Sequence, residues 1–185
     1  MGSRIGVGLL GLGTVGGGVA SILLNPKERH PLVADLQLVR VAVRDLGRPR
    51  PVELATDILT TDPADVVNDP AVDVVVEVIG GIEPARSLIL QAIATGKSVV
   101  TANKTVIARH RQEIAEAAAK AGVYVLIEAA VGGGIPIIEP LKQSLGANRI
   151  NRVSGIINGT TNYILTRMAD EGAAYDEVLR DAQDL

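Results

Sequence analysis

Apolar stretches of strand length alternate along much of the chain with longer segments in which apolar residues recur at helical spacing. Runs rich in Val, Ile and Leu predict buried strands at residues 5–10, 36–43, 73–79, 97–101 and 123–127. Helical spacing lies between them, at residues 14–24, 84–95 and 104–121. Strands that alternate with helices form parallel sheets covered on both faces. The pattern therefore predicts an α/β fold with a doubly wound parallel sheet of the Rossmann type.

The connections between these elements are less regular. Residues 26–35 and 46–51 are polar and contain proline, which predicts surface loops. Residues 52–68 fit no single pattern, although Pro63 is well placed to open a short helix.

The pattern changes after Glu128. Residues 129–135 are small and rich in glycine, and the segments that follow predict a helix, a strand and two further helices at residues 136–145, 150–157, 159–171 and 175–185. We therefore place a first domain at residues 1–129 and the start of a second, α+β domain at residues 130–185. Since the last helical pattern has no closing signal, we expect the rest of that domain to be missing.

Composition narrows the possible functions. The net charge is −3, with no Cys, Phe or Trp and three tyrosines. A nucleic-acid-binding protein normally has a basic surplus, so we expect no nucleic-acid partner. Without cysteine there are no disulfides, thiolate metal sites or cysteine nucleophiles. No run reaches the roughly 18 apolar residues of a membrane span, and the N-terminus lacks a signal-peptide cleavage site. We therefore expect a soluble, cytoplasmic protein without a membrane partner.

A glycine motif follows the first predicted strand and opens the first predicted helix. Gly11, Gly13 and Gly16 have the G-x-G-x-x-G spacing of dinucleotide-binding turns. In that context Gly11 permits a tight turn, Gly13 lets a pyrophosphate approach the backbone, and Gly16 permits close packing of the helix. The amides of Thr14 and Val15 then face the anion. A glycine-rich turn without a ligand is the alternative.

The end of the second predicted strand bears on the choice of cofactor. An acidic residue there favours the ribose hydroxyls of NAD, whereas an arginine accommodates the 2′-phosphate of NADP. Arg44 comes first, with Arg48 and Arg50 close behind, so we favour NADP. Because Asp45 follows directly, NAD is still an alternative cofactor. The alternative interpretation of the arginines is that they belong to a solvated loop and bind no ligand.

Two further segments follow the third and fourth predicted strands, where ligands bind in open α/β sheets. The first contains Gly80 and Gly81, and the second contains Thr101 and Lys104. A lysine at the start of a helix opposes the helix dipole, which favours a role near a developing negative charge over a merely solvated side chain.

The remaining motifs allow two interpretations each. Carbonyls of the glycine-rich segment at residues 128–136, together with Glu128, suit a hard cation, although a turn that joins domains is the commoner explanation. Asn158 and the hydroxyls after it form either a helix N-cap or a site for a substrate carboxylate. His30 and His110 lack the neighbours of a catalytic or metal site.

Taken in order, the motifs resemble those of the homoserine dehydrogenase family. The resemblance rests on the stretches GLLGLGTVGGGV, VVVEVIGG, GKSVVTANK, EAAVGGGIPII and GIINGTTNYILTRM. It implies an enzyme that interconverts L-homoserine and L-aspartate 4-semialdehyde with NAD(P), on the route to threonine, methionine and isoleucine. It also implies a homodimer when the protein is intact.

The resemblance also implies roles for particular residues. It places cofactor contacts at Gly11, Gly13, Thr14 and Val15, with Thr101 and Lys104 near the nicotinamide and the substrate. The motifs described above add contacts at Gly16, Arg44 and Gly80. Lys104 and Thr160 are also expected to act in catalysis, and Thr160 matches a position that lines the homoserine pocket. A sodium ion is implied at Glu128 and at the carbonyls of Val131, Gly133 and Ile135.

One part of the family pattern is missing. A Gly-Tyr-Ala-Glu-Ala-Asp-Pro segment, followed by an Asp and a Lys, normally comes after the last helix, whereas this chain ends at Leu185. We therefore expect the chain to bind NAD(P) with little or no dehydrogenase activity alone. A non-catalytic, dinucleotide-binding regulatory module is the alternative. Phosphorylating semialdehyde dehydrogenases are excluded because there is no cysteine, and short-chain dehydrogenases because no Tyr-x-x-x-Lys occurs.

Overall fold

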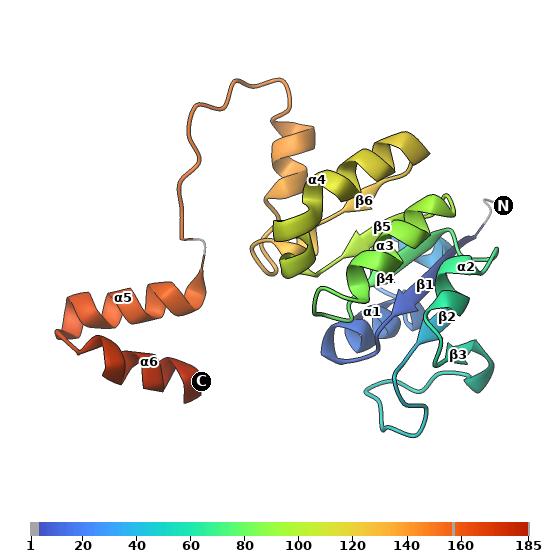
Figure 1. The fold of residues 1–185 in the computed structure, drawn as a ribbon, viewed down its shortest axis with the longest axis horizontal. Coiled ribbons are helices and arrows are strands. Elements are labelled where there is room, and N and C mark those ends of the chain that lie inside the picture. Colours follow the sequence, from blue (N-terminus) through green and yellow to red (C-terminus); the bar gives the residue numbers. More distant parts are fainter. Residues whose placement is uncertain (1–3, 157, 185) are drawn as a thin grey trace. The chain divides into compact units, whose positions relative to one another are not determined.

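The computed structural model describes residues 4–156 and 158–184, and its central feature is a six-stranded, all-parallel sheet (Figure 1). The strands are β1 (Ile5–Leu10), β2 (Leu36–Ala42), β3 (Leu59–Thr60), β4 (Val74–Glu77), β5 (Ser98–Thr101) and β6 (Val125–Leu126). Their order is β3-β2-β1-β4-β5-β6. This is the order of doubly wound dinucleotide-binding sheets, whose ligands bind at the carboxyl edge where the winding reverses, here between β1 and β4.

Helices cover both faces of the sheet, as the sequence predicts. They are α1 (Thr14–Leu24), α2 (Ala64–Asn68), α3 (Ala85–Ala94) and α4 (Lys104–Ala121). Successive strand side chains point to opposite faces. Leu10 therefore packs in the core beneath α2, α3 and α4, whereas Leu9 packs with Ala20 of α1 on the other face.

Several elements differ from their predicted extent. The predicted strand at residues 73–79 is ordered as a strand only over Val74–Glu77, because β1 and β5 pair with it only there. The short strand β3 was not predicted; its two residues pair with Val41 and Ala42 of β2. Two residues are too few for a periodic signal, so only the neighbouring strand defines this one. Helix α2 does follow Pro63.

Residues 135–185 form a second compact unit, separate from residues 1–134. Within it, α5 (Gly159–Glu171) and α6 (Tyr175–Asp184) form a helical hairpin (Figure 1). Ile164 and Val178 are buried in it, and Arg167 bridges to Asp181. A short π-helix, Pro140–Ser144, lies within the segment predicted as a helix at residues 136–145.

The predicted strand at residues 150–157 is wrong over its described part. Residues 150–156 are irregular and exposed, and Ile157 lies outside the described residues. A strand must pair its backbone amides and carbonyls with a neighbour, and residues 135–156 and 158–184 contain no other strand. The described part of the second unit therefore contains helices and irregular segments.

An ion cluster joins the N-terminal part of α3 to α4. The guanidinium of Arg86 donates to Glu113 Oε2 over 2.8 Å and pairs with Glu83 at 3.3 Å. The hydrogen bond from Arg86 lowers the pKa of Glu113, and a hydrogen bond from Ser87 lowers the pKa of Glu83. Both carboxylates are thus stabilised in their charged form.

We expect Arg86→Met to lower the melting temperature more at pH 7 than at pH 3. A carboxyl whose pKa is lowered by folding contributes stability above its unfolded pKa of about 4.3, and loses it as the pH falls through the folded value. Melting curves followed by circular dichroism at both pH values test this, with Arg109→Met on the exposed surface of α4 as the control. A difference that stays constant with pH would show that Arg86 acts through packing instead.

Candidate functional site

The turn between β1 and α1 depends on two glycines. Gly11 has a φ of +102°, in the region that residues with a side chain rarely adopt, and its amide donates to the Ala42 carbonyl over 3.0 Å. A Cβ on Gly16 would lie 2.1 Å from the carbonyl oxygen of Gly11. The close approach of α1 to this turn therefore requires both residues to be glycine, whether or not a ligand binds.

Gly13 has no such structural requirement. Any residue can adopt its φ of −83°, and a Cβ added at this position would have no neighbouring protein atom within 4 Å. Gly13, Thr14 and Val15 are exposed, and no side chain caps the start of α1. The first amides of a helix have no acceptor within it and carry positive partial charge. The turn therefore leaves space and hydrogen-bond donors for an anion directly beside Gly13.

The carboxyl ends of β4 and β5 bring two more predicted segments to the same edge of the sheet. Gly80 and Gly81 are exposed with φ values of +81° and +74°. Lys104 is exposed at the first position of α4. Thr101, in contrast, is fully buried, and its hydroxyl donates to Glu77 Oε2 over 2.6 Å. The Thr101 hydroxyl is therefore engaged in a hydrogen bond within the protein interior.

Sequence reasoning missed Glu77. The available signal was an acidic residue within the otherwise apolar, β-branched run at residues 74–79, where a solvated carboxylate has no place. The side chain is 0% exposed and accepts the Ile79 amide over 2.9 Å. It lies at the end of β4, between the segments that contain Gly80 and Thr101.

Beyond β2, the loop that contains Arg44 is organised by its other charged residues. Arg50 donates to the carbonyl of Leu46 over 2.9 Å and also to that of Asp45, while the Asp45 carboxylate accepts the Gly47 amide. The side chain of Arg44 is exposed. The loop therefore uses Asp45 for its own turn and presents Arg44 to solvent.

The residues implied as sodium ligands fall on both sides of the division between the two units. Glu128 begins a single 3₁₀ turn, Glu128–Ala130, and its carbonyl accepts the Val131 amide over 3.1 Å. Gly133 has a φ of +62°, and Ile135 is the first residue of the second unit. Within residues 4–156 and 158–184, no group of three His, Asp or Glu side chains is arranged to hold a metal ion.

Thr160 lies in the second unit, exposed in the first turn of α5. The Asn158 side chain accepts the Thr161 amide over 2.7 Å, which confirms the predicted helix N-cap. Among the described helices, none is long and apolar enough to cross a membrane.

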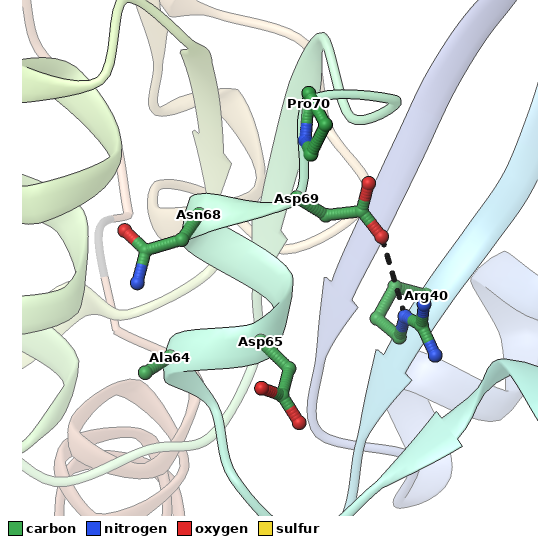
Figure 2. Close-up of a pocket in the computed structure, with 6 residues that line it drawn as sticks. All are labelled: Arg40, Ala64, Asp65, Asn68, Asp69 and Pro70. Atoms are coloured by element: carbon green, nitrogen blue, oxygen red, sulfur yellow. Dashed lines mark hydrogen bonds and ion pairs between the residues drawn. The ribbon is translucent and has the colours of Figure 1, made fainter.

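A groove of about 540 Å³ lies elsewhere (Figure 2). It is lined by Arg40, Ala64, Asp65, Asn68, Asp69 and Pro70. Asp69 and Pro70 precede β4 and so belong to the amino edge of the sheet, opposite the glycine turn. Asp69 is occupied by internal contacts, with Arg40 at 3.3 Å and the Ala71 amide at 2.9 Å. The groove is therefore separate from the candidate site.

Comparisons with known proteins identify the family. Residues 11–128 match the model of the homoserine dehydrogenase NAD-binding domain, and residues 136–185 match that of homoserine dehydrogenase. A homoserine dehydrogenase from Synechocystis is 62% identical over 97% of this chain, which covers 41% of that protein. A crystal structure of the Thiobacillus denitrificans homoserine dehydrogenase superposes with a TM-score of 0.81 at 52% identity, covering 98% of this chain and 42% of that one.

A hyperthermophilic archaeal homoserine dehydrogenase solved in complex with NADPH is more distant in sequence. It has a TM-score of 0.78 at 26% identity, and the match covers 98% of this chain and 61% of that one. The chain thus spans about two fifths of the Synechocystis relative's length, and that span includes the NAD-binding domain. By its matches to the family models and to these relatives, this chain belongs to the homoserine dehydrogenase family.

Proposed function

We propose that the chain is the dinucleotide-binding part of an enzyme that interconverts L-homoserine and L-aspartate 4-semialdehyde. The observation that carries this proposal is the open space beside Gly13: the fold does not require glycine there, whereas a bound pyrophosphate does. The exposed amides at the start of α1 are the donors that such an anion needs.

We favour NADP over NAD as the cofactor. Arg44 is exposed after β2, where the 2′-phosphate of NADP lies in this fold, and Asp45 is engaged in its own loop. The archaeal relative solved with NADPH supports the same choice. When bound, the nicotinamide ring supplies the hydride acceptor or donor.

The chain's own residues would orient the reactants and stabilise charge. The amides of Thr14 and Val15 would hold the pyrophosphate, and Gly80 would leave room for the cofactor at the end of β4. The exposed ammonium of Lys104 would stabilise the oxygen of the substrate as its charge changes. Thr160 would contribute to the homoserine pocket.

A sodium ion forms part of the proposal. Glu128 and the carbonyls of Val131, Gly133 and Ile135 offer the oxygen ligands that hard cations prefer. The left-handed backbone at Gly133 supports a turn that presents carbonyls. For the intact protein we also propose a homodimer in the cytoplasm, with small-molecule substrates and neither nucleic acid nor membrane as a partner.

Fluorescence titration of the 185-residue chain with NADPH and NADH, with and without L-homoserine, tests the function. We expect saturable binding of NADPH that is tighter than that of NADH, a change in affinity when homoserine is present, and little or no turnover. Nucleotide binding that homoserine leaves unchanged would favour the non-catalytic module. Absence of nucleotide binding would contradict the proposal.

A further inference from the structure

Glu77 is a buried acid that forms an ion pair with none of the residues that the structure describes. It is the only acidic side chain less than a tenth exposed among the described residues. The one buried lysine, Lys97, donates to the carbonyls of Asp69 and Val72 before β4, so it lies at the other end of the strand. Burying a carboxyl group is costly unless its hydrogen bonds compensate, so a purely apolar strand would serve the core better.

The hydrogen bonds of Glu77 join the two segments that end β4 and β5. One carboxylate oxygen accepts the Ile79 amide at 2.9 Å, and the other accepts the Thr101 hydroxyl at 2.6 Å. The oxygen of that hydroxyl accepts the Asn103 amide over 2.9 Å. The Thr101 hydroxyl therefore links the two segments, because it donates to Glu77 and its oxygen keeps a lone pair for the Asn103 amide.

Asn103 extends this network in two directions. Its side-chain nitrogen donates to the Gly81 carbonyl over 2.7 Å, and its side-chain oxygen accepts the Val106 amide in the first turn of α4. The backbone at Gly80 and Gly81, the end of β5 and the start of α4 are therefore held by one continuous set of hydrogen bonds that begins at Glu77. Lys104 is the residue that directly follows Asn103.

We propose that Glu77 is the positioning residue for the nicotinamide end of the cofactor site. It fixes the distance between the turn at Gly80 and the start of α4. The nicotinamide ring of the cofactor and Lys104 are thereby held in one arrangement relative to each other. This inference rests on the proposed function. It assigns Glu77 no contact with the adenosine half, which belongs to the turn at Gly13 and to Arg44.

Glu77→Gln is the variant that tests the inference, because it preserves volume but replaces one acceptor oxygen with a donor. The probes are NADPH and 2′,5′-ADP, which contains the phosphorylated adenosine half without nicotinamide. We expect the Kd for NADPH to rise roughly tenfold, as for loss of one hydrogen bond, and that for 2′,5′-ADP to change less than about twofold. The exposed Glu116→Gln on α4 is the matched control.

A merely structural role would not change the ratio of the two affinities. If Glu77→Gln raised the Kd of both ligands equally, or changed neither Kd, the inference would be overturned. If the parent chain bound neither ligand, the result would contradict the proposed function instead. If Glu77→Gln does not fold, Thr101→Val tests the same network because it removes the hydroxyl that Glu77 accepts. This variant must raise the ratio of the Kd for NADPH to the Kd for 2′,5′-ADP. Thr101→Ser keeps the hydroxyl and must return this ratio to the value of the parent chain. An unchanged ratio in Thr101→Val would equally refute the role.

Discussion

Replacement of Gly13 by alanine is expected to weaken NADPH binding between about tenfold and a hundredfold, while the melting temperature changes little. The added methyl group has no protein atom within 4 Å, and the backbone at Gly13 suits alanine. It would instead occupy the space of the pyrophosphate and lengthen the hydrogen bonds from the start of α1. Fluorescence titration and thermal melting of the same samples measure the two effects.

Two glycines in the same helix provide matched controls. A methyl group on Gly16 would lie 2.1 Å from the Gly11 carbonyl, so Gly16→Ala is expected to cost about 1–3 kcal/mol of stability together with binding. Gly18→Ala meets no atom within 4 Å and should stabilise α1 by about 0.5–1 kcal/mol. If Gly13→Ala lost stability but kept its affinity, the open space beside Gly13 would have no role in binding.

Arg44→Ala is expected to raise the Kd for NADPH about tenfold to a hundredfold and to leave that for NADH within about twofold. The guanidinium is exposed after β2 and offers charge-assisted hydrogen bonds to a 2′-phosphate, which NADH lacks. Titrations with both nucleotides at the same ionic strength measure the selectivity directly.

Arg48→Ala in the same loop is the control, since it removes the same charge a few residues away. General electrostatic attraction would weaken NADPH binding similarly in both variants and would fall with added salt. An equal loss for NADH and NADPH in Arg44→Ala would show that Arg44 does not select the cofactor.

Helices whose ends are marked by capping residues could be predicted from the sequence alone. The bounds of α1, α4 and α5 agree with their predicted ranges. Asn103 and Asn158 cap the starts of α4 and α5 through their side chains, and Gly122 and Gly172 end them with positive φ. These interactions span only a few residues, so they are visible in the sequence without the rest of the fold.

Contacts between distant residues could not be predicted in this way. The apolar pattern at residues 150–157 resembles a strand, yet residues 135–156 and 158–184 contain no other strand with which residues 150–156 could pair. The run at residues 73–79 was predicted as a buried strand, but it did not indicate that Glu77 would meet Thr101, which lies 24 positions further along the chain.

The amino-acid sequence by itself determined the alternation of strands and helices, the glycine turn and the family resemblance, because each depends on residues close together in the chain. Only the tertiary structure showed that the fold requires glycine at positions 11 and 16 but does not require it at Gly13. Likewise, only the pairing of β4 with β5 showed that the Thr101 hydroxyl is the buried hydrogen-bond partner of Glu77. The physical reason is the same in both cases: free space and hydrogen-bond partners are properties of neighbouring segments in three dimensions.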